Sequence, residues 1–203
     1  MTGWDRAARL YDFQLLLERT AIDRALDLAA VKPGDRLLDL GTGTGALLAR
    51  LAARATAPRE AVGVDLSASM LAAARHLPAP WRLVRADATA LPFSNESFEV
   101  VTAAYVLHLL EPAARRAVIA EAARVLRSDG RLVTVTVAEP QSPALASLLA
   151  PVVAIARRSR GIMAGLRVLD PRRELIDGGF CVSAACRTGR GYPSLVVVAE
   201  RRR

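Results

Sequence analysis

Short apolar runs alternate with longer amphipathic stretches along most of the chain. The apolar runs have the length and composition of buried strands, and they lie at 36–40, 61–65, 81–87, 98–105 and 131–138. Segments with helical spacing of apolar residues lie between them, at 45–55, 67–77 and 111–130. This alternation predicts a parallel sheet with helices on both faces.

The segment 111–130 also has clear signals for its two ends. Pro112 lies in its first turn, and Asp129-Gly130 predicts the end of the helix. Beyond it the pattern changes to a short helix and two strand-like segments, 180–188 and 194–200, joined by a glycine-containing turn. We expect these two strands to pair antiparallel at one edge of the sheet. The predicted fold class is α/β, with a doubly wound, mostly parallel seven-stranded sheet and an antiparallel C-terminal hairpin.

Length and composition predict one domain over 1–203, because 203 residues with 52% hydrophobic content can bury a full core. Within this domain, 1–30 is predicted to be an N-terminal helical cap and 141–169 a helical insertion. The longest uncharged apolar stretch, 142–156, is too short to span a bilayer and is interrupted by Pro151. The N-terminus carries charges where a signal peptide needs an apolar core, so we expect a cytoplasmic protein.

The chain is strongly basic, with a formal net charge of +8 and only one lysine, Lys32, among its 28 basic residues. This charge could attract nucleic acid, anionic lipid or an acidic substrate. It could equally reflect a GC-rich genome, because the arginines are spread over the predicted helices. The two cysteines, Cys181 and Cys186, would face opposite sides of a strand, which predicts reduced thiols and neither a disulfide nor a metal site.

Three glycines, Gly41, Gly43 and Gly45, follow the first predicted strand directly and begin the first helix. A turn of this kind surrounds one ligand group with backbone N–H groups and the positive end of a helix dipole. It therefore predicts a nucleotide-like ligand at the carboxyl edge of the sheet, where open α/β sheets bind their ligands. Asp65 ends the second strand at the same edge and can accept hydrogen bonds from two ribose hydroxyls.

The glycine loop fits two templates. Gly41, Gly43 and Ala46 match the dinucleotide-binding pattern for NAD or FAD, while Asp39 to Gly45 read as D-x-G-x-G-x-G. That second pattern is the first motif of class I S-adenosylmethionine-dependent methyltransferases. Asp87 favours it, because a further carboxylate at the end of the third strand could accept a hydrogen bond from an adenine amine. A dehydrogenase would also need a catalytic group, and the chain has no Tyr-x-x-x-Lys pair.

The ordered series of motifs over 10–137 resembles the ubiquinone/menaquinone-biosynthesis-type branch (methyltransferase domain 11) of the class I methyltransferases. The resemblance implies a Rossmann-like methyltransferase fold, S-adenosyl-L-methionine as the cofactor and methyl transfer to a small molecule. The cofactor-binding residues that it implies run in chain order as follows: Tyr11 closing over the cofactor; Asp39, Gly41, Thr42, Gly43 and Gly45 around the methionine part; Asp65, Leu66 and Met70 at the ribose and adenine; Asp87 and Ala88 at the adenine edge; and Ala103 and Ala104 near the amine and the methyl group. A turn-capping role for Asp39 and a core role for Met70 stay open.

Methyl transfer from a sulfonium needs alignment of donor and acceptor and exclusion of water, and no nucleophilic residue. A general base is needed only where the acceptor arrives protonated. His108 and Tyr105 follow the fourth strand and are the candidate catalytic residues, although a structural role for His108 is an open alternative. His76 is predicted to be exposed and remote, and Tyr192 is a candidate only if the hairpin turn reaches the site.

The segment 142–167 is apolar in its first half and then carries several arginines. We expect it to cover the methyl donor and to receive a hydrophobic acceptor such as a quinone, lipid or secondary metabolite, with peripheral contact to an anionic membrane surface. A helix packed on the domain is the alternative. An RNA methyltransferase, an NAD-dependent dehydrogenase and a non-catalytic S-adenosylmethionine-binding protein also stay open as functions. The N-P-P-Y-type loop is absent after the fourth strand, so no nucleic-acid partner is expected, and no metal is expected either.

Overall fold

The computed structural model describes residues 17–74, 76–140, 167–188 and 193–202. Two predicted site residues, Tyr11 and Tyr192, lie outside the described residues. The same holds for most of the predicted insertion, of which only the end after residue 166 is described.

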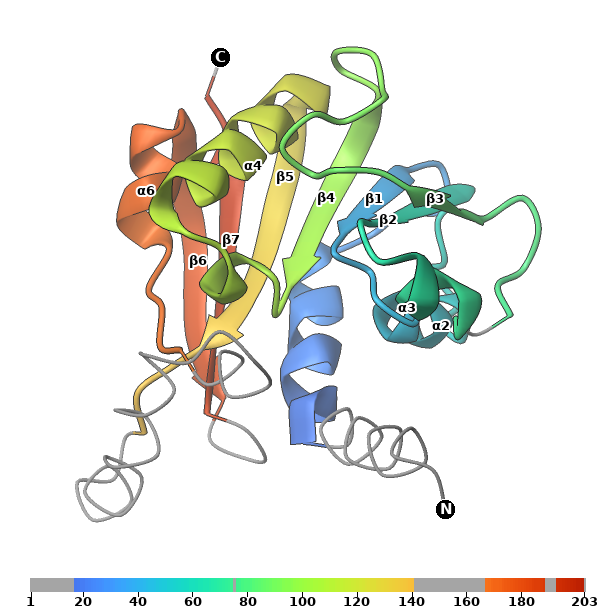
Figure 1. The fold of residues 1–203 in the computed structure, drawn as a ribbon, viewed down its shortest axis with the longest axis horizontal. Helices are drawn as coiled ribbons and strands as arrows, with labels where there is room; N and C mark the ends of the chain where they lie inside the picture. The colour runs from blue at the N-terminus through green and yellow to red at the C-terminus, as the bar shows by residue number, and fades with distance from the viewer. Residues whose placement is uncertain (1–16, 75, 141–166, 189–192, 203) are drawn as a thin grey trace.

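Seven strands form one sheet in the order β3-β2-β1-β4-β5-β7-β6 (Figure 1). The parallel strands are β1 (Arg36–Leu40), β2 (Glu60–Asp65), β3 (Arg82–Arg85), β4 (Phe98–Ala104) and β5 (Leu126–Val137). β7 (Ser194–Arg201) lies between β5 and β6 (Phe180–Thr188) and runs antiparallel to both. The predicted mixed sheet with its C-terminal hairpin is confirmed.

Each face of the sheet has its own hydrophobic core. Because successive side chains of a strand point to opposite faces, Leu37 and Val100 pack on one face and Leu38 and Val101 on the other. The helix at 17–29 and α2 (Ala46–Ala52) cover the first face. The second face is covered by α4 (Pro112–Val125) and α6 (Arg172–Asp177) (Figure 1). The sheet is thus covered by helices on both faces, as predicted.

Arginine side chains hold the first described helix against its neighbours. Arg50 of α2 donates to Asp23 of this helix, with Nε 2.8 Å from Oδ1, and Arg54 donates to Asp27 at 2.6 Å. Arg131 of β5 donates to main-chain carbonyls at the end of the helix. The helix is therefore fixed relative to both α2 and the sheet.

The helix α4 is shorter than its sequence predicts, because it ends at Val125 and not at Asp129-Gly130. Its C-terminal carbonyls lack partners within the helix, and the N–H of Ser97 donates to the carbonyl of Val125 at 2.8 Å. The next residue, Leu126, is fully buried and pairs with Phe98 at the start of β5. The predicted end of the helix was wrong, since a neighbouring loop and strand pairing terminate it first.

Two other elements near the carboxyl edge are also shorter than predicted. The helix α3 spans only Ala68–Ala72, and none of its side chains is buried. Most helical stability in proteins comes from packing an apolar face, so a helix without such a face does not extend. The strand β3 is likewise limited to four residues at the edge of the sheet.

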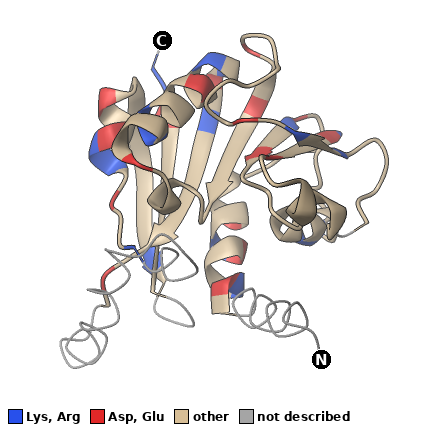
Figure 2. Ribbon diagram, viewed as in Figure 1, with Lys and Arg blue, Asp and Glu red and all other residues tan. Residues whose placement is uncertain are grey.

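Other sequence predictions concern the thiols, the charge and the membrane. Cys181 and Cys186 are free, so no disulfide joins them. The described basic residues are spread over several elements (Figure 2). In the part of the chain that the structure describes, no helix is long and apolar enough to cross a membrane.

Candidate cofactor site

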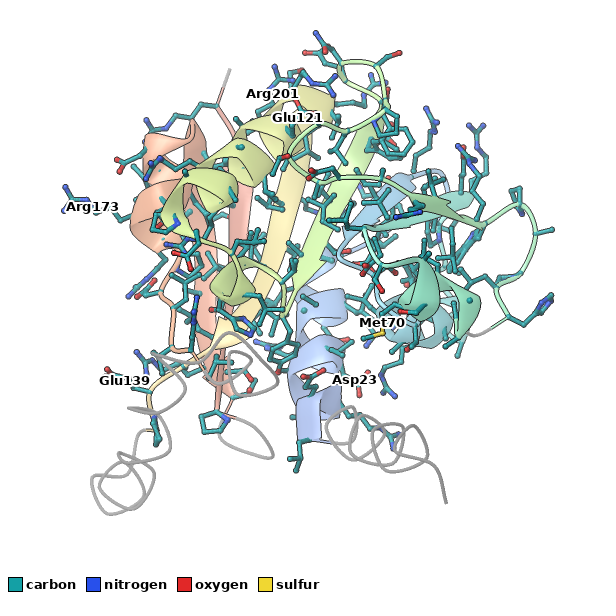
Figure 3. All side chains as sticks on the ribbon, in the orientation of Figure 1. Asp23, Met70, Glu121, Glu139, Arg173 and Arg201 are labelled. Atoms are coloured by element: carbon teal, nitrogen blue, oxygen red, sulfur yellow. The ribbon has the colours of Figure 1, made fainter. Side chains whose placement is uncertain are left out.

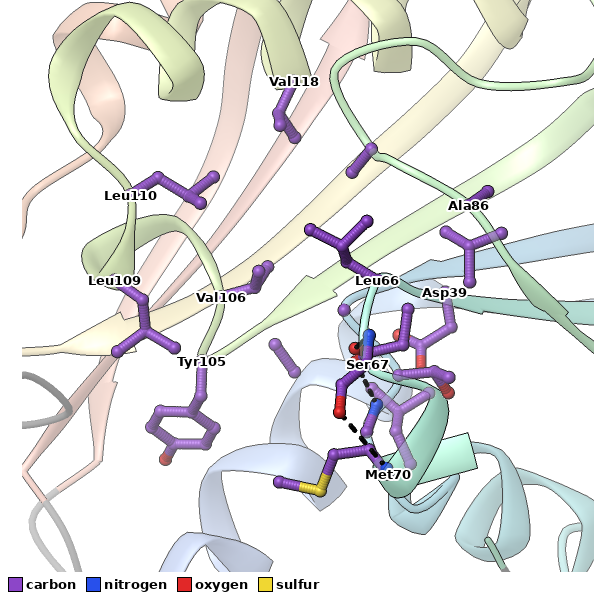
Figure 4. A pocket seen from close by; sticks show the side chains of 18 of the residues that line it. Asp39, Leu66, Ser67, Met70, Ala86, Tyr105, Val106, Leu109, Leu110 and Val118 are labelled. Atoms are coloured by element: carbon purple, nitrogen blue, oxygen red, sulfur yellow. Dashed lines mark hydrogen bonds between the residues drawn. The ribbon is translucent and has the colours of Figure 1, made fainter. Parts of the chain in front are cut away.

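A cavity of about 420 Å³ lies at the carboxyl edge of the sheet (Figure 4). The loops that follow β1, β2, β3 and β4 line it, and the first described helix contributes to its wall. The predicted cofactor residues that line this cavity are Asp39, Gly41, Thr42, Gly43, Asp65, Leu66, Met70, Asp87, Ala88 and Ala104. Met70 lies toward the same end of the sheet as Asp23 of the first described helix (Figure 3). The fold thus brings residues from four separate loops to one place.

Some predicted site residues do not line the cavity. Ala103 is 1% exposed and packs in the core beneath α4, and Gly45 is a buried residue that precedes α2. His108 lies in the short 3₁₀ helix η1 (Leu107–Leu109), is 3% exposed and is also absent from the lining. Tyr105 does line the cavity, and its ring packs edge to face against His108 with 6.1 Å between centroids.

The glycine loop adopts the left-handed backbone conformation at three positions, with φ of 64° at Gly41, 56° at Gly43 and 70° at Gly45. Residues with a side chain rarely adopt this conformation. At Gly41 space is also lacking, because a Cβ would lie 2.6 Å from Cγ2 of Val106 in the loop after β4. The requirement for glycine at this position therefore comes from the backbone conformation and from the packing of two protein loops.

The Asp65 carboxylate is held in place by two backbone donors. Its Oδ2 accepts from the N–H of Gly43 and its Oδ1 from the N–H of Ser67, both at 2.8 Å. Each carboxylate oxygen can accept a second hydrogen bond. Asp65 therefore links the glycine loop to the loop after β2 and still has acceptor positions for two hydroxyl groups of a ligand.

Asp39 is the most buried carboxylate of the site, with 2% of its surface exposed. Desolvation by this burial raises its pKa from 3.8 to about 6, although a hydrogen bond from Thr102 Oγ1, at 2.7 Å from Oδ1, acts in the opposite direction. The negative charge of Asp65 raises the pKa further. The charge of Asp39 is therefore present at a desolvation cost that a bound cation would offset.

We predict that Asp39→Asn stabilises the protein and weakens cofactor binding. The folded-state pKa of about 6 exceeds the unfolded value, so ionisation of Asp39 lowers the free energy of unfolding. This loss of stability is absent below pH 3.8, grows between pH 3.8 and pH 6, and is complete above pH 6. At pH 8 the variant should be more stable by about 1–3 kcal/mol in urea unfolding, and the difference should shrink toward pH 5. Affinity for a cationic ligand should fall about tenfold. Lower stability of the Asp39→Asn variant at pH 8 would contradict this reasoning.

Asp87 is a different kind of carboxylate, since it is exposed and lies at the end of β3. Its Oδ1 accepts from the backbone N–H and from the hydroxyl of Thr89, each at 2.8 Å. These hydrogen bonds lower its pKa, so the group is ionised at neutral pH. It presents an acceptor at the end of the cavity that is formed by β3.

The charge of the cavity distinguishes between the two templates for the glycine loop. Its described lining contains four carboxylates, Glu18, Asp39, Asp65 and Asp87, and no lysine, arginine or histidine. Carboxylates favour a ligand with positive charge and oppose the pyrophosphate of a dinucleotide. S-adenosyl-L-methionine carries both a sulfonium and an ammonium, so this set of carboxylates fits it better than NAD.

Residues 37–130 match the family described as methyltransferase domain. These residues form a methyltransferase domain. The predicted methyltransferase family and its cofactor, S-adenosyl-L-methionine, are confirmed at the level of this domain. The glycine loop, Asp65 and Asp87 all lie within residues 37–130.

Curated relatives extend the similarity beyond the domain. The chain is 38% identical over 156 residues to the ubiquinone/menaquinone biosynthesis C-methyltransferase UbiE of Syntrophotalea carbinolica, covering 71% of this chain and 64% of that protein. It is 35% identical over 142 residues to the demethylmenaquinone methyltransferase of Beutenbergia cavernae, covering 68% of this chain and 57% of that protein. The match thus spans less than two thirds of the length of either relative.

The fold has close counterparts among solved structures. A putative methyltransferase from Bacillus halodurans superposes with a TM-score of 0.70 at 20% identity, over 91% of this chain and all of that one. At this level of identity the likeness shows the fold alone. It confirms the Rossmann-like methyltransferase fold predicted from the motifs.

Several lining residues of the methyltransferase domain and its surroundings were not predicted from the sequence. They are Glu18 and Ile22 on the first described helix, Val106, Leu109 and Leu110 after β4, and Val118 on α4. Glu18 and Ile22 are four residues apart, which places them on one face of a helix. That spacing was a usable signal, but nothing local indicated which partner this face meets.

Proposed function

We propose that this protein is an S-adenosyl-L-methionine-dependent methyltransferase that methylates a ring carbon of a quinone-type acceptor. The observation that carries the proposal is the acidic cavity around the glycine loop of a methyltransferase domain. The acceptor class rests on the similarity to proteins named as quinone and menaquinone methyltransferases.

The residues of the cavity divide the work of holding the cofactor. Asp65 would accept from the ribose hydroxyls, Asp87 from the adenine amine, and the backbone of the glycine loop would surround the amino-acid part. When bound, S-adenosyl-L-methionine supplies an electrophilic methyl group on a positively charged sulfur. The protein then contributes alignment of the two reactants and exclusion of water.

The apolar side chains after β4 suit a hydrophobic acceptor. Leu109 and Leu110 line the cavity together with Val118 of α4, and Leu109 is 45% exposed. Apolar lining with a few polar groups is typical of small-molecule sites. These residues would shield the reacting atoms from water while the acceptor ring is in place.

Tyr105 is our candidate for direct contact with the acceptor. It lines the cavity at the end of β4 with φ of 56°, a conformation that is uncommon for an aromatic residue. Its hydroxyl lies 2.6 Å from Oγ of Ser194, the first residue of β7. Methylation would form a bond between the ring carbon and the methyl group, break the bond between that methyl group and the cofactor sulfur, and release the proton of the ring carbon to solvent. Deprotonation of a neighbouring ring hydroxyl of the reduced quinone makes that carbon more nucleophilic. Tyr105 would orient that hydroxyl, and His108 would act as a positioning residue behind its ring.

The proposal predicts a specific transfer of label. The purified protein would be incubated with S-adenosyl-L-methionine labelled in its methyl group and with reduced demethylmenaquinone, a small phenol or bulk RNA as separate acceptors. Label should enter the quinone and be recovered in a carbon-bound methyl group by mass spectrometry. Label in RNA, or binding of the cofactor without transfer to any quinone, would contradict the proposal.

A further inference from the structure

Glu18 is a buried acidic residue that no motif of the methyltransferase domain includes. It is 5% exposed, lies toward the N-terminal end of the described part of the first helix and lines the cavity. Ile22, one helical turn further on, lines the cavity as well. The described part of this helix therefore presents one face, which includes the Glu18 carboxylate, to the cofactor site.

The part of the cavity that Glu18 faces can be identified from its neighbours. Ile22 belongs to the same buried cluster as Leu47, which lies in the first turn of α2, and Leu47 lines the cavity too. The helix α2 directly follows the glycine loop. Asp87, at the adenine end, comes from β3 at the far edge of the sheet, whereas the helix lies beneath the ends of β1 and β4 (Figure 1). Glu18 thus lies at the end of the cavity that is formed by the glycine loop.

The position of Glu18 is fixed by contacts on another face of its helix. Asp23 and Asp27 take hydrogen bonds from Arg50 and Arg54 of α2. These ion pairs hold the helix in one orientation relative to α2. A carboxylate on a helix held in this way loses little additional freedom when it binds a ligand group.

The electrostatics of this end favour a hydrogen-bonding cation. A carboxylate attracts a positively charged group of a ligand, and the low dielectric of a buried site strengthens that attraction. Asp39 brings a second carboxylate into the same cavity, and the described lining contains no basic side chain. Of the two cationic groups of the cofactor, only the ammonium can donate hydrogen bonds, since a sulfonium has no N–H or O–H. A charge-assisted hydrogen bond is about twice as strong as a neutral one.

We propose that Glu18 binds the α-ammonium of the amino-acid part of S-adenosyl-L-methionine, and so makes the site specific for ligands that carry this group. The inference rests on the proposed function, because it concerns the cofactor of that reaction. It assigns a direct role in cofactor recognition to the first described helix, which lies outside residues 37–130 of the methyltransferase domain.

Three ligands separate this role from others. Calorimetric titration would compare S-adenosyl-L-methionine, S-adenosylhomocysteine and 5′-methylthioadenosine, of which the last has no amino-acid part. Glu18→Gln has the same shape without the charge. We expect it to weaken binding of the first two ligands by about tenfold or more and to leave the affinity for the third unchanged. Asp129→Asn is the matched control, since it removes a carboxylate that is 81% exposed, does not line the cavity and lies outside the first described helix. It should leave binding of all three ligands unchanged.

Other outcomes would overturn the assignment. If Glu18→Gln lowered the affinity for all three ligands equally, the role of Glu18 would be structural. If it lowered the affinity for S-adenosyl-L-methionine alone, Glu18 would contact the sulfonium. Unchanged affinities would show that Glu18 has no part in binding. If the unmodified protein bound none of the adenosyl ligands, the proposed function itself would fail, which is distinct from each of these results.

Discussion

Asp65→Ala is expected to weaken binding of S-adenosyl-L-methionine by at least about 100-fold. The carboxylate has a double role, because it would accept from two ribose hydroxyls and already accepts from the N–H groups of Gly43 and Ser67. Hydrogen bonds to a charged group are worth about 1.5–3 kcal/mol each, so loss of two accounts for this factor. Calorimetric titration with S-adenosyl-L-methionine at pH 7.5 would measure it.

A control variant separates this effect from a change in overall charge. Asp129→Ala removes a carboxylate that is 81% exposed and does not line the cavity, and its affinity should match that of the unmodified protein. Asp65→Asn should give an intermediate loss, since an amide can still accept at one oxygen. Full affinity in Asp65→Ala would overturn the assignment of the ribose site.

Gly41→Ala should both destabilise the protein and impair cofactor binding. The left-handed conformation costs an alanine about 1–2 kcal/mol, and its Cβ would lie 2.6 Å from a methyl group of Val106. Overpacking of this kind costs a further ~1–3 kcal/mol. We therefore expect the free energy of unfolding to fall by about 2–5 kcal/mol in urea denaturation. Because Val106 lines the cavity, its displacement should also weaken cofactor binding by about tenfold or more.

Gly34→Ala is the matched substitution in this chain. No atom would lie within 4 Å of the added Cβ, and the backbone at Gly34 is not in the left-handed region. The change should leave stability within about 0.5 kcal/mol or raise it slightly, with cofactor affinity unchanged. Similar stability of the two alanine variants would mean that the contact between Gly41 and Val106 is not constraining.

The elements of the sheet and the ligand-binding edge could be predicted because they depend on local patterns. The strands at 36–40 and 180–188 match the observed β1 and β6, since apolar runs and flanking turns mark each strand without reference to its partners. The glycine loop and the carboxylates Asp65 and Asp87 follow strands directly. In a parallel sheet, the residues that follow strands meet at one edge.

The features that could not be predicted depend on residues far apart in the chain. The helix α4 ends at Val125 because a loop about 30 positions earlier takes its last carbonyl, a contact that a local signal such as Asp129-Gly130 does not reveal. Thr102 donates to Asp39 because their strands pair in one register. Neither residue indicates by its neighbours in sequence that a raised pKa results.

By itself, the sequence determined the alternation of strands and helices, the position of the glycine loop and the set of carboxylates that follow the strands. These depend on backbone conformation and on side-chain periodicity, which are properties of short segments. Only the tertiary structure decided that Glu18 faces the cavity, that Val106 leaves no room for a side chain at Gly41, and that Asp39 is desolvated. Burial, close packing and electrostatic environment are set by atoms from distant segments, and they arise only when the chain has folded.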